Sequence, residues 1–275
     1  MSHGARAIPI AAALVVAAST SWAQGAKPLK KCAHDAVVAG TVCMDKYEES
    51  VWRVPDPLVS NRGLVAKIQG GKATVADLAN GGATQLGIAI DDYAPCADSG
   101  QNCTNDIYAV SLGHVPPSRY ITWFQAQRAC TNARKRLPTN AEWQAAVAGT
   151  PDPGGDDGST DCNTASFPSM ANTGSRGNCV SSDGAFDMVG NVHEWVGDWV
   201  PRSTACGDWS AGVSSDYQCL AGANTTGEPG ALLRGGSLTD GWGAGPFEVI
   251  GSVPPSFGPD IFPYTGDNIG VRCAR

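Results

Sequence analysis

Ten cysteines constrain this 275-residue chain more than any other feature of its sequence. Eight fall into four pairs that are close in sequence, and two are left over far apart: Cys32 with Cys43, Cys96 with Cys103, Cys162 with Cys179, Cys206 with Cys219, and the remaining Cys130 and Cys273. Each short disulfide would close a loop of about 10–15 residues and contribute about 2–3 kcal/mol. The spacing favours five structural disulfides, while other connectivities stay open. Because no Cys-x-x-Cys segment occurs, neither a zinc knuckle nor a thioredoxin-like site is indicated.

The N-terminal residues predict export to an oxidising compartment, where disulfides persist. Arg6 precedes an apolar stretch over residues 8–18, and Ser21-Trp22-Ala23 has the small-residue pattern of a cleavage site. The apolar stretch is too short to span a bilayer. We therefore expect residues 1–23 to be a signal peptide cleaved near Ala23 and Gln24, with a retained anchor as the alternative. The mature protein is then periplasmic, in the cell envelope or extracellular, and has no membrane span.

Composition narrows the fold class further. The chain has 34 Gly, 18 Pro, 42% hydrophobic residues and only 16% charged residues. It has too few charges for a coiled coil and too many apolar residues for a disordered protein. The formal net charge of −7, without a basic stripe, argues against a nucleic-acid partner. These features predict a loop-rich single domain over residues 24–275.

Two consecutive helices are the clearest secondary structure in the sequence. Thr122 predicts the N-cap of a helix over residues 123–133. Thr139 and Glu142 form a capping box for a second helix, which should end at Gly149. We expect one face of the first helix to carry Phe124, Ala126, Cys130 and Ala133.

The remaining sequence predicts short strands and loops. Residues 40–47 alternate as a strand does, and Thr74 marks a helix start within the mixed region 53–113. Residues 151–161 are acidic and glycine-rich but lack EF-hand spacing, so they predict a solvated loop. The composition of residues 205–263 excludes long helices.

Four segments in order resemble the sulfatase-modifying-factor family: RLPTNAEW (136–143), FDMVGNVHEW (186–195), LLRGGS (232–237) and NIGVRCAR (268–275). CMDKYE (43–48) and PSRYITWFQA (117–126) fit the same pattern, whereas residues 53–113 are atypical of the family. The family includes formylglycine-generating enzymes, a domain of ergothioneine-forming sulfoxide synthases, and pyoverdine-maturation proteins. The resemblance implies an α+β fold of the C-type-lectin-like, formylglycine-generating-enzyme type, low in regular secondary structure. It also implies a disulfide between Cys130 and Cys273, as in the family's extracellular members.

The segment from Asp187 to Glu194 is the strongest candidate metal site. A Gly-Asn turn between two acids can bring both carboxylates and backbone carbonyls to one point, an oxygen-rich shell that suits Ca²⁺. By resemblance, calcium would be bound by the side chains of Asp187 and Glu194 and the main-chain oxygens of Gly190 and Val192. The alternative is that the two acids only cap and pair within the turn. A second calcium would use Asn163 and the Thr164 carbonyl, although its downstream acidic ligand has no match.

We expect the histidine and tryptophan side chains in and near this segment to have structural roles rather than roles in catalysis or ligand binding. His193 could be a catalytic base, but we expect a surface or core-edge histidine. Trp195 and Trp199 are expected in the core rather than on a ligand platform.

The catalytic metals of the best-known relatives find no ligands here. Formylglycine-generating enzymes bind copper through two cysteines after the GGS segment, but residues 238–244 contain none. The ergothioneine-type iron site needs histidines supplied largely by a separate domain, which this sequence lacks. Copper and iron are therefore not supported, and a pocket near this segment would instead offer Arg234, Ser237, Asp240 and Trp242. A salt bridge between Arg234 and Asp240 is the structural alternative.

Three functions remain open from the sequence. The first is an exported, calcium-stabilised family member that is an oxidoreductase of divergent chemistry. The second is a non-catalytic, lectin-like module that binds a peptide, glycan, small molecule or partner protein. The third is a structural envelope protein.

Overall fold

The computed structural model describes residues 29, 31–90, 92–152, 154–166, 168–202, 205–206, 215–222, 224–252 and 268–275. The predicted signal peptide, residues 1–23, lies outside the described residues. No helix in the described ranges is long and apolar enough to cross a membrane.

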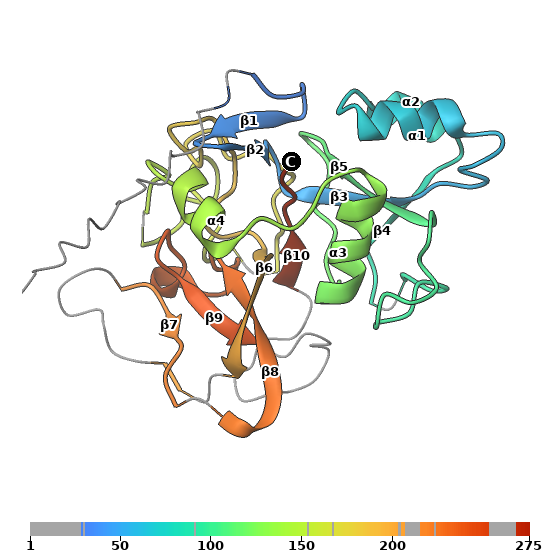
Figure 1. Ribbon diagram of the computed structural model, residues 1–275. Helices are drawn as coiled ribbons and strands as arrows, with labels where there is room; N and C mark the ends of the chain where they lie inside the picture. Colours follow the sequence, from blue (N-terminus) through green and yellow to red (C-terminus); the bar gives the residue numbers. More distant parts are fainter. Residues whose placement is uncertain are drawn as a thin grey trace, which may run out of the picture.

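A five-stranded sheet, with strand order β10-β6-β8-β9-β7, lies in the lower half of the view in Figure 1. Its members are β6 (His193–Arg202), β7 (Gln218–Cys219), β8 (Asn224–Arg234), β9 (Val249–Ser252) and β10 (Ile269–Val271). β6 is antiparallel to β8 and parallel to β10, so the start of β6 is covered on both sides. Residues 193–202 and 224–234 are longer strands than the short ones the sequence predicted, because each pairs along its length with a neighbour in this sheet.

The N-terminal half adds two smaller sheets. β1 (Ala36–Ala39) and β2 (Val42–Asp45) form a hairpin, whose second strand lies within the predicted strand 40–47. β3 (Glu49–Arg53) pairs with β4 (Thr84–Leu86) and β5 (Ile107–Ser111).

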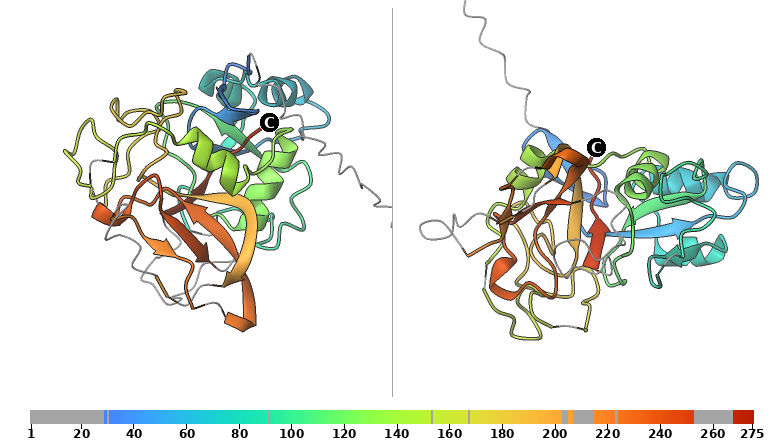
Figure 2. Two further views of the ribbon diagram at one scale, coloured as in Figure 1. Left: turned by 60° about the vertical axis from the view of Figure 1, so that its left-hand side comes forward. Right: turned by 90° about the horizontal axis from the view of Figure 1, so that it is seen from below.

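The mixed region 53–113 contributes α1 (Arg62–Gln69) and α2 (Val75–Asn80) as well as β4 and β5. Both helices lie at one side of the molecule, away from the five-stranded sheet (Figures 1 and 2). Thr74 is the N-cap of α2 and completes a capping box with Asp77, as the sequence predicted for a helix start. Leu64, Ile68 and Leu78 pack against Trp52 and Tyr108 of the three-stranded sheet.

The two predicted central helices are present. α3 (Trp123–Asn132) and α4 (Asn140–Ala146) begin at Thr122 and Thr139, each with the capping box formed. α4 ends at Ala146 rather than at Gly149, which has a φ of +80° in the turn that follows. Phe124 is half-buried rather than on the buried face of α3, because it packs beside Trp199.

Five disulfides join the cysteines in the predicted pairs. Four close loops with sequence separations of 7 to 17 residues. The fifth, Cys130–Cys273, spans 143 residues and ties α3 to the segment after β10. An α+β fold with much irregular structure, held by disulfides, is therefore confirmed.

Candidate functional site

The turn before β6 has a tightly constrained backbone. Asp187, Gly190 and Asn191 all have positive φ values, of 56°, 75° and 61°. Gly190 is required here, because a Cβ at this position would lie 2.5 Å from the Asn163 carbonyl oxygen. The Asn191 amide donates to that same carbonyl at 2.7 Å. The turn is thus held against the loop that carries both residues of the predicted second calcium site.

The two acids of the predicted calcium site are both buried. Oε1 of Glu194 accepts from Arg272 Nε at 2.8 Å, and Oε2 accepts from Trp143 Nε1 at 2.6 Å. Asp187 accepts the Gly174 amide at 2.5 Å. Arg272 is the direct cationic partner of Glu194, a contact that sequence reasoning missed.

Excess negative charge surrounds Arg272. Glu48 is also buried and accepts a hydrogen bond from Asn191 Nδ2 at 2.6 Å. Its carboxylate lies close enough to Asp187 and Glu194 for the negative charges to repel one another. Burial raises the pKa of Asp187 to about 7, with Arg272 opposing the rise. Burial and the charges of Asp187 and Glu194 raise the pKa of Glu48 well above its usual value.

These residues fit a cation in charge but only partly in geometry. The three carboxylates outnumber the two guanidinium groups that act on them, those of Arg272 and Arg176, so a calcium ion would balance the remaining charge. Arg272 and Trp143, however, already donate to both oxygens of Glu194, which would have to exchange or share these donors to reach an ion. Asp187 is therefore the better-placed side chain, and the calcium site of Asp187, Gly190, Val192 and Glu194 stays a prediction.

Asn163 and Thr164, the predicted second site, connect neighbouring loops. Asn163 Nδ2 donates to Asn191 Oδ1 at 2.9 Å, and the Thr164 carbonyl accepts the Gly241 amide at 2.8 Å. This second site also stays a prediction.

Beyond the turn lies a chain of buried polar side chains that starts in the GGS segment. The Ser237 amide and hydroxyl donate to Asp240 Oδ2 at 2.7 and 2.8 Å. His193 Nε2 lies 3.2 Å from the same oxygen, and His193 Nδ1 lies 3.5 Å from Glu248 Oε1. Ser237 and Asp240 are therefore brought together as the sequence suggested, with two further residues beneath them.

His193 is not the surface or core-edge residue that the sequence predicted, because only 1% of it is exposed. It opens β6 between β10 and β8, and this double pairing places it inside the molecule. Glu248 belongs to no motif, and only its distance from His193 in space identifies it. Burial, with the charges of Asp240 and Asp216, raises the pKa of Glu248 well above its usual value, although Arg234 opposes the rise.

Arg234 acts on Glu248 through its charge, but its own contacts are with other residues. Its guanidinium stacks over the Trp143 ring, 4.6 Å from the centroid, and donates to Gln144 Oε1 and the Pro246 carbonyl. Burial lowers its pKa to about 10. Within the described ranges no ion pair joins Arg234 to Asp240, so the salt bridge considered from sequence does not form.

An open cavity of about 500 Å³ lies above Asp240. Its lining includes Tyr217, Thr239, Gly241 and Trp242. Trp242 is 69% exposed, yet its ring lies against Gly154, where a Cβ would come within 2.0 Å of a ring carbon. The cavity thus combines an exposed but supported aromatic face with a carboxylate. Trp195 is in the core as predicted, whereas Trp199 is 38% exposed.

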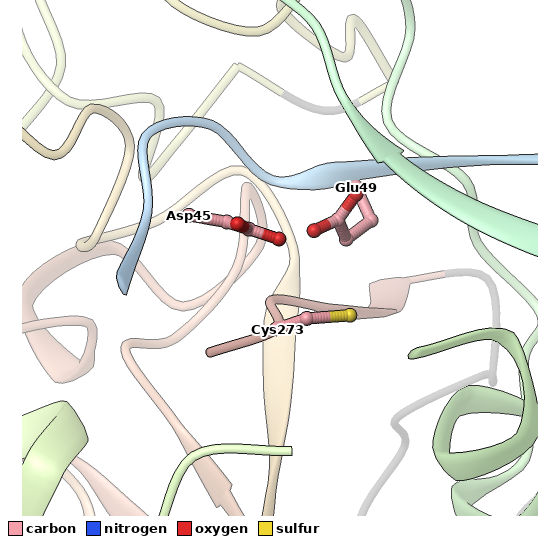
Figure 3. Close-up of side chains that lie close together, drawn as sticks. All are labelled: Asp45, Glu49 and Cys273. Atoms are coloured by element: carbon pink, nitrogen blue, oxygen red, sulfur yellow. The ribbon is translucent and has the colours of Figure 1, made fainter. Parts of the chain in front are cut away.

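A second group of ligand-type side chains is structural. Figure 3 shows Asp45 and Glu49 pointing toward each other near Cys273. The Cys273 sulfur is in the disulfide with Cys130, and the Lys135 ammonium lies 2.5 Å from Asp45 and 3.3 Å from Glu49. The ammonium takes the place that a cation would occupy.

The absence of free thiols bears on copper chemistry. All ten cysteines are disulfide-bonded, so no thiolate pair is available to bind Cu(I) in the oxidised protein. Of the histidines that the structure describes, His34 and His114 are exposed and only His193 lies among other ligand-type groups. No three-histidine iron site forms within these ranges.

The protein is a loop-rich α+β domain that carries the turn before β6 and the GGS segment. Residues 101–275 match the family described as "Sulfatase-modifying factor enzyme 1-like domain". This match covers more than half of the chain, so the protein belongs to the sulfatase-modifying-factor family, whose fold is C-type-lectin-like. The serine/threonine-protein kinase pkn1 of Chlamydia caviae is 36% identical over 83 residues, which are 29% of this chain and 13% of the kinase. The chain therefore spans only a small part of this relative.

Two solved structures are also similar. The Major Tropism Determinant U1 variant has 19% identity and a TM-score of 0.46, covering 90% of this chain and 54% of that one. CarF has 18% identity and a TM-score of 0.35, covering 58% of this chain and 67% of that one.

Proposed function

We propose that this protein is an exported binding module of the sulfatase-modifying-factor family that takes up a basic peptide side chain in the cavity beside Trp242. The single observation that carries the proposal is the open cavity of about 500 Å³ with Trp242 and Tyr217 in its lining and Asp240 among its walls. Aromatic faces attract ammonium and guanidinium groups, and a carboxylate adds direct pairing. The net charge of −7 also favours a cationic ligand.

Local packing prepares the cavity for binding. Ser237 and His193 fix one Asp240 oxygen, and Gly154 supports the Trp242 ring. Gly243 lies against the Tyr217 ring, where a Cβ would come within 2.2 Å of a ring carbon. Side chains held in this way lose little conformational freedom when a ligand binds.

We expect Trp242→Ala to weaken binding about tenfold, because a desolvated cation–aromatic contact contributes about 1–2 kcal/mol. The measurement is binding of the mature protein to an array of Lys- and Arg-containing peptides and neutral oligosaccharides. Phe247→Ala is the matched control, since Phe247 is 45% exposed but does not line the cavity.

Equal peptide binding by the protein and by Trp242→Ala would contradict the proposal. Binding to oligosaccharides alone, lost in Trp242→Ala, would keep the cavity but overturn the basic ligand.

A divergent oxidoreductase is the second candidate. The observation in its favour is the buried chain of Ser237, Asp240 and His193, which reaches the cavity through Asp240. Its chemistry would have to proceed without the copper–thiolate pair, since every cysteine is in a disulfide.

Calcium stabilisation is part of the proposal and can be tested at Asp187. We expect EDTA to lower the melting temperature of the protein by several degrees, because an ion at 100 times its Kd contributes about 2.7 kcal/mol. Asp187→Asn should remove this dependence, while Glu142→Gln, on the exposed side of α4, should keep it. Glu194→Gln is unsuitable, since it also disrupts the ion pair with Arg272. Identical melting in EDTA and in calcium would rule the site out.

A further inference from the structure

Three buried side chains of different chemistry converge below the cavity. One ligand atom each from His193, Asp240 and Glu248 lies within 4.8 Å of the other two. The two closest separations are 3.2 Å, from His193 Nε2 to Asp240 Oδ2, and 3.5 Å, from His193 Nδ1 to Glu248 Oε1. These two distances involve different ring nitrogens, so an ion would be held by one nitrogen of His193 and by both carboxylates. Donor atoms around an ion with bonds of 2.0–2.2 Å are about 3.4 Å apart, so donors within 4.8 Å of one another would close on the ion by side-chain rotation.

Glu248 provides a second, independent observation. Its side chain is fully buried, and neither carboxylate oxygen has a hydrogen-bond donor among the residues that the structure describes. Gly236 packs closely beside Oε2, because a Cβ at this position would lie 2.6 Å from this oxygen. A buried carboxylate without donors is costly, and coordination of a cation removes this cost.

The remaining contacts resemble the surroundings of bound metals. Ser237 donates twice to Asp240 Oδ2 and so fixes the orientation of that carboxylate. Hydrogen bonds of this kind orient ligating side chains around metal ions.

We propose that His193, Asp240 and Glu248 bind a divalent first-row transition-metal ion such as Zn²⁺. An imidazole nitrogen with two carboxylates suits Zn²⁺ and its neighbours, whereas Ca²⁺ takes oxygen ligands. Because Asp240 also lines the cavity, a bound metal ion and the proposed basic side chain would compete for its carboxylate. This site is distinct from the predicted calcium site at Asp187, and metal binding here does not require the proposed peptide ligand.

The test uses the mature protein with its disulfides intact and without a histidine tag. After removal of metals with EDTA, the protein is dialysed and titrated with ZnCl₂, and bound zinc is counted by mass spectrometry. We expect one zinc per chain, not displaced by excess calcium. Glu248→Gln and Asp240→Asn should each weaken zinc binding at least 100-fold, while Glu142→Gln, with an exposed carboxylate on α4, should bind as the unchanged protein does.

Melting temperatures measured in EDTA and with zinc distinguish a loss of zinc binding from a change in the stability of the variant. In EDTA, Glu248→Gln should melt at or above the temperature of the unchanged protein, because a neutral amide replaces a buried carboxylate without donors. Zinc should raise the melting temperature of the unchanged protein and leave that of Glu248→Gln where it is. Absence of stoichiometric zinc binding, or equal zinc affinity in Glu248→Gln, would overturn the proposal. Peptide binding measured in EDTA reports on the proposed function separately.

Discussion

Replacing both Cys130 and Cys273 by alanine is expected to lower the free energy of unfolding by about 5 kcal/mol. The disulfide between them closes a loop with a sequence separation of 143 residues. In the chain-entropy treatment, a loop of this length restricts the unfolded chain far more than a short one does. Both sulfurs are fully buried, so their loss also leaves small cavities. Urea unfolding followed by circular dichroism gives the change.

The matched control is Cys96→Ala with Cys103→Ala. This disulfide is also buried, but its sequence separation is only 7 residues, so its loss should cost about 2 kcal/mol. If both double variants lose the same stability, loop length is not the cause, and the long disulfide does not stabilise the fold by restricting the unfolded chain.

Arg272→Gln is expected to destabilise the protein by about 3–5 kcal/mol, because it leaves buried carboxylates without their cation. Arg272 is fully buried and lies 2.7 Å from Glu194 Oε1 through Nη2. It also donates to the backbone carbonyls of Asp45 and Phe186 at 2.9 and 2.7 Å. Glutamine can replace neither the charge nor the full set of donors. Urea unfolding at neutral pH measures the effect.

Arg136→Gln provides the comparison for this prediction. Arg136 also pairs with a glutamate, Glu142, but its side chain is 44% exposed. Exposed ion pairs contribute about 0–1 kcal/mol, so this variant should be nearly as stable as the unchanged protein. A small effect at Arg272, similar to that at Arg136, would show that the buried cluster does not depend on its guanidinium.

Features coded by neighbouring residues were predictable from the sequence. The N-cap at Thr122 and the capping box of Thr139 with Glu142 are local signals, and both helices begin where these signals predict. The four cysteine pairs that are close in sequence also form the disulfides that their spacing predicted. The end of α4 was less predictable, since Gly149 can take its positive φ either directly after a helix or, as here, in a following turn.

The candidate sites were only partly predictable, because their partners are distant in sequence. Glu194 was predicted as a calcium ligand from its motif, but its pairing with Arg272, which joins residues 78 positions apart, was not predicted. The burial of His193 depends on β10, and its neighbour Glu248 carries no motif. Such contacts follow from strand pairing rather than from any local pattern.

The position of residues 268–275 has a consequence for the biogenesis of the protein. β10 follows the other strands in sequence, yet it pairs with the start of β6, and the Arg136 and Cys43 backbones exchange hydrogen bonds with Ala274 and Arg275. During synthesis, the start of β6 and the backbones of Arg136 and Cys43 lack these hydrogen bonds until residues 268–275 have been translated. The domain therefore completes its folding only once residues 268–275 have left the ribosome, and slow release of that segment would expose the unfinished sheet to aggregation.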